Sequence, residues 1–206
     1  MVSTNREEYS FKVILLGDSG VGKTSFSLRA AGLEEMPRTT FRGFWMPTTR
    51  MVIDNCPIKL EVWDTFGQER YRALSRVYYQ GAHAIVLMYD TTESKSFDNI
   101  FDWYNTVKEN LAAVPLLYLV GNKTDLAESR VVPLESASRA AEELEARFFE
   151  TSVKKASDFN DIVLTIVKDM KDKTDNKNGD HSKKKLGGGK KLATINESPQ
   201  KRATCC

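Results

Sequence analysis

The sequence predicts a single α/β domain of the doubly wound type, with a mostly parallel six-stranded sheet, one antiparallel edge hairpin and about five helices. Short, continuously apolar runs recur along the chain, as in strands that are buried on both faces. Segments with a helical pattern alternate with these runs, which is typical of parallel sheets covered by helices. The 206 residues are enough for one such domain with a full core.

The expected strands and helices follow in order along the chain. The run FKVILL ends at a glycine, as a buried strand before a loop does, and two strand-like pieces flank the turn-like DNCP stretch, which predicts the hairpin. The runs HAIVLMY and VPLLYLV are apolar throughout, and RFFET is a last short strand. The strands are expected at Phe11–Leu16, at two pieces within Met51–Val62, and at His83–Tyr89, Val114–Val120 and Arg147–Thr151. The helices are expected at Gly22–Ala30, Gln68–Tyr79, Ser94–Asn110, Leu134–Ala146 and Ala156–Asp172.

The domain is expected to span residues 9–171, after a polar and flexible start at residues 1–8. Residues 172–206 are rich in Lys, Gly, Asn and Ser and carry no aromatics, which predicts a disordered basic tail. From Lys171 onward there are ten basic and four acidic residues, whereas the whole chain has 30 and 28. The body is therefore mildly acidic, which argues against a nucleic-acid partner, and the basic tail favours an anionic membrane surface.

Three cysteines bear on the redox environment of the protein. Cys56 lies alone in the DNCP turn, and Cys205 and Cys206 are the last two residues. They form neither a disulfide framework nor a metal-ligand spacing, so a reduced, cytosolic protein is expected. The sequence contains no run of 18 apolar residues, so no membrane-spanning helix is predicted. Its polar start shows neither a secretory signal nor the glycine that myristoylation needs.

A glycine-rich loop, GDSGVGKT at residues 17–24, follows the first strand and opens the first helix. In this context the pattern predicts a phosphate-binding loop (P-loop), in which backbone N–H groups and a helix N-terminus surround phosphate oxygens, rather than a structural glycine turn. Lys23 is the expected catalytic cation for the β- and γ-phosphates, and the Thr24 hydroxyl is an expected Mg²⁺ ligand. The residues expected to bind the nucleotide phosphates are Asp18, Ser19, Gly20, Val21, Gly22, Lys23, Thr24 and Ser25.

The stretch NKTD at residues 122–125 follows an apolar strand and predicts which nucleotide base the chain binds. The Asp125 carboxylate can accept hydrogen bonds from both the ring N–H and the exocyclic amine of guanine, a donor pair that adenine lacks. The stem of Lys123 can lie along the base plane, and a backbone N–H of TSVKK (residues 151–155) can reach the guanine oxygen. The residues expected to bind guanine are Asn122, Lys123, Asp125, Ser152, Val153 and Lys154.

The stretch DTFGQ at residues 64–68 ends another strand. Asp64 is placed to hold Mg²⁺ through water. The Gly67 N–H can bond the γ-phosphate while that phosphate exists, and Gln68 can orient the attacking water. The alternative for Gln68 is an ordinary exposed residue at the start of a helix.

Together, GDSGVGKT, WDTFGQE, NKTD and TSVKK resemble the motifs of Ras-like small GTPases. QERYRAL, YYQGA and MYDTT, together with the final Cys-Cys, are similar to segments of the Rab proteins within that family. The resemblance covers about residues 9–170 and the last two residues. It implies a P-loop GTPase domain that binds GTP or GDP with Mg²⁺ and hydrolyses GTP slowly unless an activating protein assists.

The resemblance to Rab proteins also implies partners and a place of action. The expected partners are an exchange factor, a GTPase-activating protein, a GDP-dissociation inhibitor, an escort protein and effectors of vesicle traffic. The expected location is the cytoplasmic face of intracellular endosomal or vesicle membranes, with a cytosolic pool of monomers. The resemblance implies a geranylgeranyl group on each of Cys205 and Cys206, in agreement with the stable anchoring that two lipid chains give where one is marginal. The lysine clusters of the tail either add attraction to an anionic surface or only keep the linker soluble.

The stretch RTTFRGFW at residues 38–45 departs from the Rab pattern Thr-Ile-Gly-Val-Asp-Phe, whose threonine closes over Mg²⁺ and the γ-phosphate. Counted back without gaps from KLEVWDT, the threonine position falls on Phe41. Thr40 serves as the Mg²⁺ ligand if the loop is one residue shorter. The alternatives are that Thr39 serves instead, or that neither threonine does and the active-state clamp is absent. Phe41, Phe44 and Trp45 form an unusual effector surface, unless the last two simply start the next strand.

Two further departures motivate a rival function. No aromatic residue lies between Ser27 and Thr40, where small GTPases usually place one against guanine, so weaker retention of the base is expected. Phe66 replaces the usual alanine of DTAGQ and is bulky enough to hinder the second switch. The rival is a guanine-nucleotide-binding scaffold with impaired switching or hydrolysis, and turnover of GTP separates it from a working switch. An ATP-using kinase is disfavoured by NKTD and by the lack of a lid segment.

Overall fold

The computed structural model describes residues 8–33, 46–64, 76–154 and 156–186. The chain divides into two compact units, Met1–Asp172 and Lys173–Cys206. Within the second unit the described residues are helical as far as Leu186. Among the described residues, no helix is both long and apolar enough to cross a lipid bilayer.

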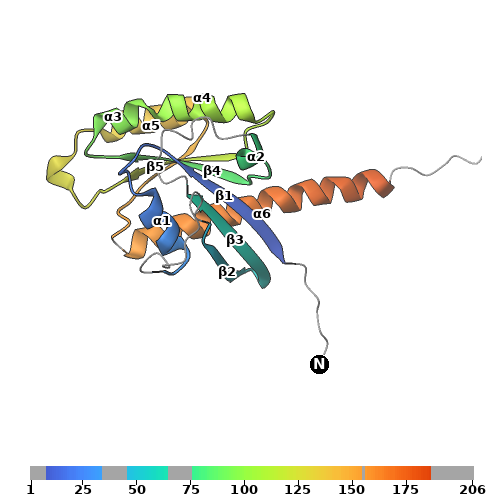
Figure 1. Cartoon of the computed structure of the whole chain (residues 1–206). Coiled ribbons are helices and arrows are strands. Elements are labelled where there is room, and N and C mark those ends of the chain that lie inside the picture. Colours follow the sequence, from blue (N-terminus) through green and yellow to red (C-terminus); the bar gives the residue numbers. More distant parts are fainter. Residues whose placement is uncertain (1–7, 34–45, 65–75, 155, 187–206) are drawn as a thin grey trace, which may run out of the picture. The chain divides into compact units, whose positions relative to one another are not determined.

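A six-stranded sheet forms the centre of the first unit, in the order β2-β3-β1-β4-β5-β6 (Figure 1). Only β2 runs antiparallel to its neighbour; every other pair is parallel. This arrangement confirms the predicted α/β class with one antiparallel edge hairpin. The strands are β1 (Tyr9–Leu16), β2 (Thr48–Ile53), β3 (Cys56–Asp64), β4 (Ala84–Asp90), β5 (Leu116–Asn122) and β6 (Arg147–Glu150).

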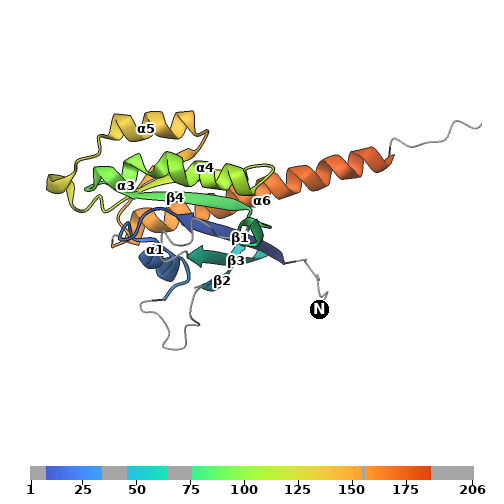
Figure 2. The same ribbon diagram turned by 45° about the horizontal axis from the view of Figure 1, so that its top comes forward.

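Helices cover both faces of the sheet, and Figures 1 and 2 show α1 and the part of α6 within the first unit on one side, with α3, α4 and α5 on the other. The described α-helices are α1 (Lys23–Ala30), α2 (Arg76–Tyr79), α3 (Ser94–Asp98), α4 (Ile100–Asn110), α5 (Leu134–Glu143) and α6 (Ala156–Leu186). A 3₁₀ turn, η2 (Ala127–Ser129), precedes α5. The doubly wound order places the carboxyl ends of the parallel strands at one edge, where ligands of such sheets bind.

The two faces of the sheet contribute to two separate cores, because side chains alternate along a strand. In β1, Val13 and Leu15 pack toward α1 and α6, whereas Ile14 and Leu16 pack toward α4 and α5. The same alternation divides the residues of β4, all of which are buried. Burial on both faces explains why these strands read as continuous apolar runs in the sequence.

Several element boundaries differ from the prediction. The helix expected at Ser94–Asn110 is interrupted at Asn99, whose side chain turns to bond the P-loop. The helix expected to reach Ala146 ends at Glu143, because Glu145 adopts a left-handed φ of 52° that cannot continue a helix. The last helix continues past Asp172 to Leu186, with no proline in that stretch to stop it.

The hairpin forms as predicted around its turn. Asp54 and Asn55 both have positive φ, 51° and 61°, which suits the tight turn that joins two antiparallel strands. Both strands extend further than predicted, so that β3 ends on the site residue Asp64. Of the expected helix Gln68–Tyr79, only Arg76–Tyr79 falls within the described residues.

Candidate functional site

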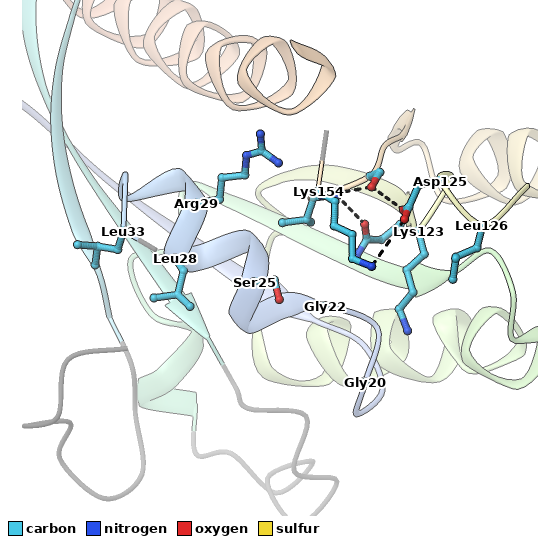
Figure 3. A pocket seen from close by; sticks show the side chains of 13 residues that line it. Gly20, Gly22, Ser25, Leu28, Arg29, Leu33, Lys123, Asp125, Leu126 and Lys154 are labelled. Carbon is cyan, nitrogen blue, oxygen red and sulfur yellow. Dashed lines mark hydrogen bonds and ion pairs between the residues drawn. The ribbon is translucent and has the colours of Figure 1, made fainter. Parts of the chain in front are cut away.

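The phosphate loop lines one pocket with the two loops predicted to bind the base, NKTD (residues 122–125) and TSVKK (residues 151–155), which are called the base-reading loops below. The pocket lies at the carboxyl edge of the sheet and has a volume of about 610 Å³ (Figure 3). In Figure 3, Ser25, Leu28 and Arg29 of α1 lie on one wall, and Asp125 and Lys154 lie on the other. Segments up to about 130 residues apart in sequence therefore share one cavity. The predicted site residues that line it are Gly20, Gly22, Ser25, Asn122, Lys123, Asp125, Ser152, Val153 and Lys154.

Four lining residues were not predicted: Leu28, Arg29, Leu33 and Leu126. Leu28 and Arg29 follow Ser25 by three and four positions on α1, so they share its helical face. That spacing was a usable signal in the sequence. Leu33 and Leu126 lie in loops, where no period indicates which way a side chain turns.

Two glycines of the phosphate loop are required by close approach as well as by backbone conformation. A Cβ atom at Gly17 would lie 2.2 Å from the Met88 carbonyl oxygen of β4. A Cβ atom at Gly22 would lie 2.2 Å from the Asn122 side-chain nitrogen, and Gly22 has a left-handed φ of 102°. The loop is thus pressed against both β4 and the base-reading loop, which leaves no room for larger residues.

Lys23 opens α1 with its ammonium group inside the phosphate loop. Its Nζ donates to the carbonyl oxygens of Gly17, at 2.7 Å, and Asp18, at 2.5 Å, and the residue is only 3% exposed. Two backbone dipoles therefore hold a buried cation at the loop. A cation positioned in this way is suited to phosphate oxygens.

Thr24 and Asp64, two of the predicted Mg²⁺ ligands, are in direct contact. The Thr24 hydroxyl donates to Asp64 Oδ2 at 2.5 Å, although the two residues come from α1 and from the end of β3. Asp64 is 1% exposed. A hydroxyl and a carboxylate are hard oxygen donors of the kind that Mg²⁺ prefers, and Mg²⁺ commonly keeps several waters beside one or two such ligands. The chemistry of this pair therefore fits the ion.

Asn122, at the end of β5, joins three loops. Its Nδ2 donates to the Val21 carbonyl oxygen of the phosphate loop at 2.8 Å, and its Oδ1 accepts from the Val153 N–H at 3.1 Å. The residue is 3% exposed. A single buried amide thus fixes the spacing between the phosphate loop and both base-reading loops.

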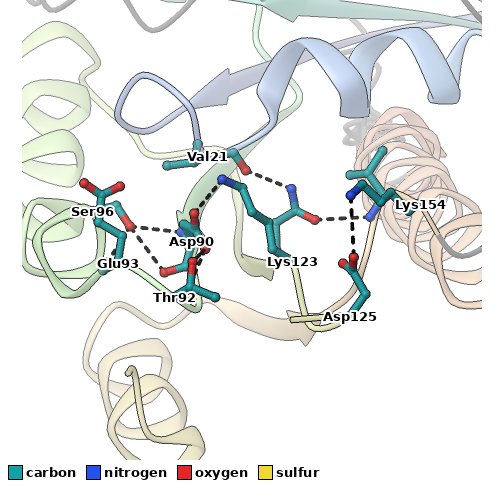
Figure 4. A network of polar contacts seen from close by, with 10 residues as sticks. Val21, Asp90, Thr92, Glu93, Ser96, Lys123, Asp125 and Lys154 are labelled. Carbon is teal, nitrogen blue, oxygen red and sulfur yellow. Dashed lines mark hydrogen bonds and ion pairs between the residues drawn. The ribbon is translucent and has the colours of Figure 1, made fainter. Parts of the chain in front are cut away.

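Lys123 adopts a left-handed backbone conformation, with φ at 69°, and its Nζ lies 2.6 Å from Asp90 Oδ2 (Figure 4). Asp90 ends β4, is 4% exposed and also accepts from the N–H and hydroxyl of Thr92. Burial acts to raise the pKa of Asp90, but the hydrogen bonds from Lys123 and Thr92 outweigh it and hold the pKa below its ordinary value. Asp90 is thus a charged partner of Lys123 that no sequence motif indicated.

Asp125 turns toward the TSVKK loop rather than toward its own strand. Its Oδ1 accepts from the Ser152 hydroxyl at 2.5 Å, and its Oδ2 lies 3.8 Å from Lys154 Nζ. Ser152 also accepts from the Lys154 backbone N–H at 3.2 Å. The two base-reading loops therefore meet at the Asp125 carboxylate, which lies in the pocket wall.

The TSVKK loop is supported from β6 by a charged pair. The Arg130 guanidinium donates to both carboxylate oxygens of Glu150, at 2.8 and 2.7 Å, and the Tyr89 hydroxyl donates to the same carboxylate at 3.3 Å. Such bidentate pairs are the geometrically specific kind of ion pair. This pair holds β6 just before the residues that bind Asp125.

Among the described residues, five of those predicted to bind phosphate do not line this pocket, namely Asp18, Ser19, Val21, Lys23 and Thr24. The Asp18 carboxylate bonds α4, Ser19 is exposed, and Val21 is fully buried with its carbonyl bonded to Asn122. The other residues singled out in the sequence lie outside the described residues, and they are Thr39, Thr40, Phe41, Phe44, Trp45, Phe66, Gly67, Gln68, Cys205 and Cys206.

Comparison with known proteins identifies the family of the chain. The family model described as the Ras family matches residues 12–172. Ras-related protein Rab-13 of Rattus norvegicus is 39% identical over 180 residues, covering 86% of this chain and 88% of that protein. Ras-related protein Rab-1 of Theileria parva is 42% identical over 170 residues (81% and 76%), and Ras-related protein Rab-8B of Homo sapiens is 36% identical over 188 residues (90% and 90%). The chain therefore belongs to the Ras family of small GTPases, within the Rab subfamily.

Proposed function

We propose that this Rab-like GTPase is a membrane-anchored switch, which binds GTP or GDP with Mg²⁺, hydrolyses GTP and regulates vesicle traffic through effectors. One observation carries the proposal: the phosphate loop, the NKTD loop and the TSVKK loop line a single pocket and are joined through Asn122. A pocket with a phosphate cradle at one end and a carboxylate at the other suits a guanine nucleotide.

The base would lie against the NKTD and TSVKK loops. Asp125 would accept from the guanine ring N–H and exocyclic amine, and the Ser152 hydroxyl already orients its carboxylate. Asn122 would keep the loops in register, while the stem of Lys123 would lie along the base. The backbone at Ser152, Val153 and Lys154 would supply N–H groups for the guanine oxygen.

The phosphates would lie within the loop at residues 18–25, where backbone N–H groups and the start of α1 offer positive charge. Lys23 would move part of its hydrogen bonding from the loop carbonyls to the β- and γ-phosphates. Thr24 and Asp64, with Thr40 from the first switch, would hold Mg²⁺, which supplies charge neutralisation for the phosphates when bound.

Hydrolysis would need few groups from this chain. Gln68 would orient the attacking water, the Gly67 N–H would sense the γ-phosphate, and Lys23 would stabilise charge on the leaving oxygens. An arginine from an activating protein would supply the roughly 10³–10⁵-fold gain typical of such help. Exchange factors, a GDP-dissociation inhibitor and effectors would complete the cycle.

The tail would place the switch on membranes. Geranylgeranyl groups on Cys205 and Cys206, added with an escort protein, would anchor the chain to the cytoplasmic face of endosomal or vesicle membranes. The basic residues of the tail would add roughly 1 kcal/mol each near an anionic surface.

Single-turnover GTP hydrolysis and nucleotide release test the switch. Gln68→Leu should abolish hydrolysis, whereas Gln80→Leu, a matched control at an exposed position, should not. Thr40→Ala should speed release of GTP more than release of GDP, because only the triphosphate state uses the first switch. Thr39→Ala shows whether the neighbouring threonine has that role instead.

A different result would favour the rival function. If wild type hydrolyses GTP no faster than Gln68→Leu, and neither threonine variant changes GTP retention, the chain holds guanine nucleotide without switching. It would then be a binding scaffold.

A further inference from the structure

The Asp18 side chain links the phosphate loop to the opposite side of the sheet. Its Oδ1 accepts from Trp103 Nε1 at 2.8 Å, and its Oδ2 accepts from Asn99 Nδ2 at 2.5 Å. The partners are 81 and 85 residues away in sequence and lie at the start of α4. Each carboxylate oxygen is therefore engaged by a donor outside the loop.

The two donors form a rigid pair. Asn99 precedes α4, and its carbonyl oxygen accepts the Trp103 backbone N–H at 3.1 Å, so the two side chains stand one helical turn apart on the same face. Trp103 is 1% exposed and packs in the core between the sheet, α4 and α5. Close packing leaves the indole N–H little freedom to move.

The backbone of the same residue faces the proposed phosphate site. The Asp18 carbonyl oxygen accepts from Lys23 Nζ at 2.5 Å, beside the Gly17 carbonyl at 2.7 Å. A continuous chain of contacts therefore runs from the buried indole through Asp18 to the cation at the phosphates. A shift of the Asp18 backbone toward or away from α4 would move this carbonyl.

We propose that Asp18 is a positioning residue: Asn99 and Trp103 grip its carboxylate and thereby hold the phosphate loop in the shape that retains the nucleotide diphosphate. This inference rests on the proposed function, because it assumes that the loop binds nucleotide phosphates. It also accounts for the break between α3 and α4, since that break frees the Asn99 side chain to reach the loop.

The test measures GDP release from the full chain with a fluorescent GDP and excess unlabelled GDP. Trp103→Phe removes the indole donor and keeps most of the packing. Asp18→Asn keeps one acceptor but turns an amide N–H₂ toward the other donor. Matched controls are Tyr104→Phe on the same helix and Asp98→Asn at an exposed position beside Asn99. Asn99→Ala removes the second donor and serves if Trp103→Phe does not fold.

Trp103→Phe, Asp18→Asn and Asn99→Ala should each release GDP on the order of tenfold faster than wild type, because each loses a hydrogen bond to the charged Asp18 carboxylate or the charge itself. The double variant, Asp18→Asn combined with Trp103→Phe, should release GDP about as fast as a single variant, because both substitutions break the same contact between the loop and α4. Affinity for GDP should fall more than affinity for GMP, which lacks the β-phosphate. Both controls should release GDP at the wild-type rate.

Three outcomes overturn the inference in distinguishable ways. Unchanged GDP release beside a lower melting temperature means that the contacts support only the fold. Independent, multiplicative effects mean that Asp18 and Trp103 act separately. If the wild-type protein retains no guanine nucleotide, the proposed function fails first and the inference fails with it.

Discussion

Replacing Asn122 with alanine removes the amide that joins three loops at the pocket. The side chain makes two hydrogen bonds, at 2.8 Å to the Val21 carbonyl and at 3.1 Å from the Val153 N–H, and it is 3% exposed. Asn122→Ala leaves one acceptor and one donor without these partners in a largely buried position. Each such group costs about 1–3 kcal/mol, so the total loss should be about 2–6 kcal/mol.

We expect this lost free energy to appear partly as lower stability of the fold and partly as weaker nucleotide binding, because both depend on the relative positions of the three loops. If half of it falls on binding, the Kd for GDP should rise by roughly 5-fold to 150-fold. Urea unfolding at saturating GDP and titration with a fluorescent GDP measure the two parts. Asn105→Ala, on the exposed face of α4, is the matched control and should change neither value. An unchanged Kd for Asn122→Ala would refute the reasoning that this amide sets the register of the pocket.

Three further predictions follow from named contacts. Gly22→Ala should weaken GDP binding at least tenfold in calorimetry, because its Cβ would lie 2.2 Å from a side-chain nitrogen; Gly32→Ala, also left-handed but with open space around it, should not. Folding lowers the pKa of Asp90 below its ordinary value of 3.8. The charged carboxylate therefore adds to the free energy of unfolding in full above pH 3.8, and this contribution is lost as the pH falls through the lower pKa of the folded state. Urea unfolding should therefore separate wild type from Asp90→Asn at pH 6 and bring them together under strongly acidic conditions, and a constant difference would argue against the ion pair. Arg130→Ala should lower the free energy of unfolding by about 1–3 kcal/mol in urea titration, because it leaves the carboxylate of Glu150 without its bidentate partner; a change within error would mean that water replaces the guanidinium.

The sequence was sufficient to predict the fold, because buried strands produce a clear pattern of apolar residues. Strands buried on both faces read as unbroken apolar runs, as β4 does from Ala84 to Asp90, so the predicted sheet was confirmed. Boundaries were less certain, because a single residue decides them. Glu145 ends a helix through its backbone conformation, and Asn99 interrupts one through a contact with a loop 81 residues away.

The candidate site was predictable where a motif fixes both residue type and spacing. Residues of the NKTD and GDSGVGKT motifs line one pocket, and Thr24 contacts Asp64, while their roles as nucleotide and Mg²⁺ ligands stay predictions. The supporting residues were not predictable, because no local pattern marks them. Asp90 and Trp103 meet the site only after the sheet has formed, and a buried tryptophan in a helix reads as an ordinary core residue.

Exchanging the base of the nucleotide tests most directly whether the Asp125 carboxylate recognises guanine in this pocket. Wild type and Asp125→Asn are each titrated with GDP and with xanthosine diphosphate, whose base replaces the exocyclic amine by a carbonyl oxygen. Glu128→Gln, on the adjacent η2 turn, is the matched control.

Wild type should prefer GDP strongly, because the carboxylate accepts from both guanine donors. Asp125→Asn should lose GDP and prefer xanthosine diphosphate, since the amide N–H₂ can donate to the new carbonyl. If Asp125→Asn instead binds GDP as tightly as wild type does, guanine is not read by this carboxylate, and the proposed nucleotide site is wrong.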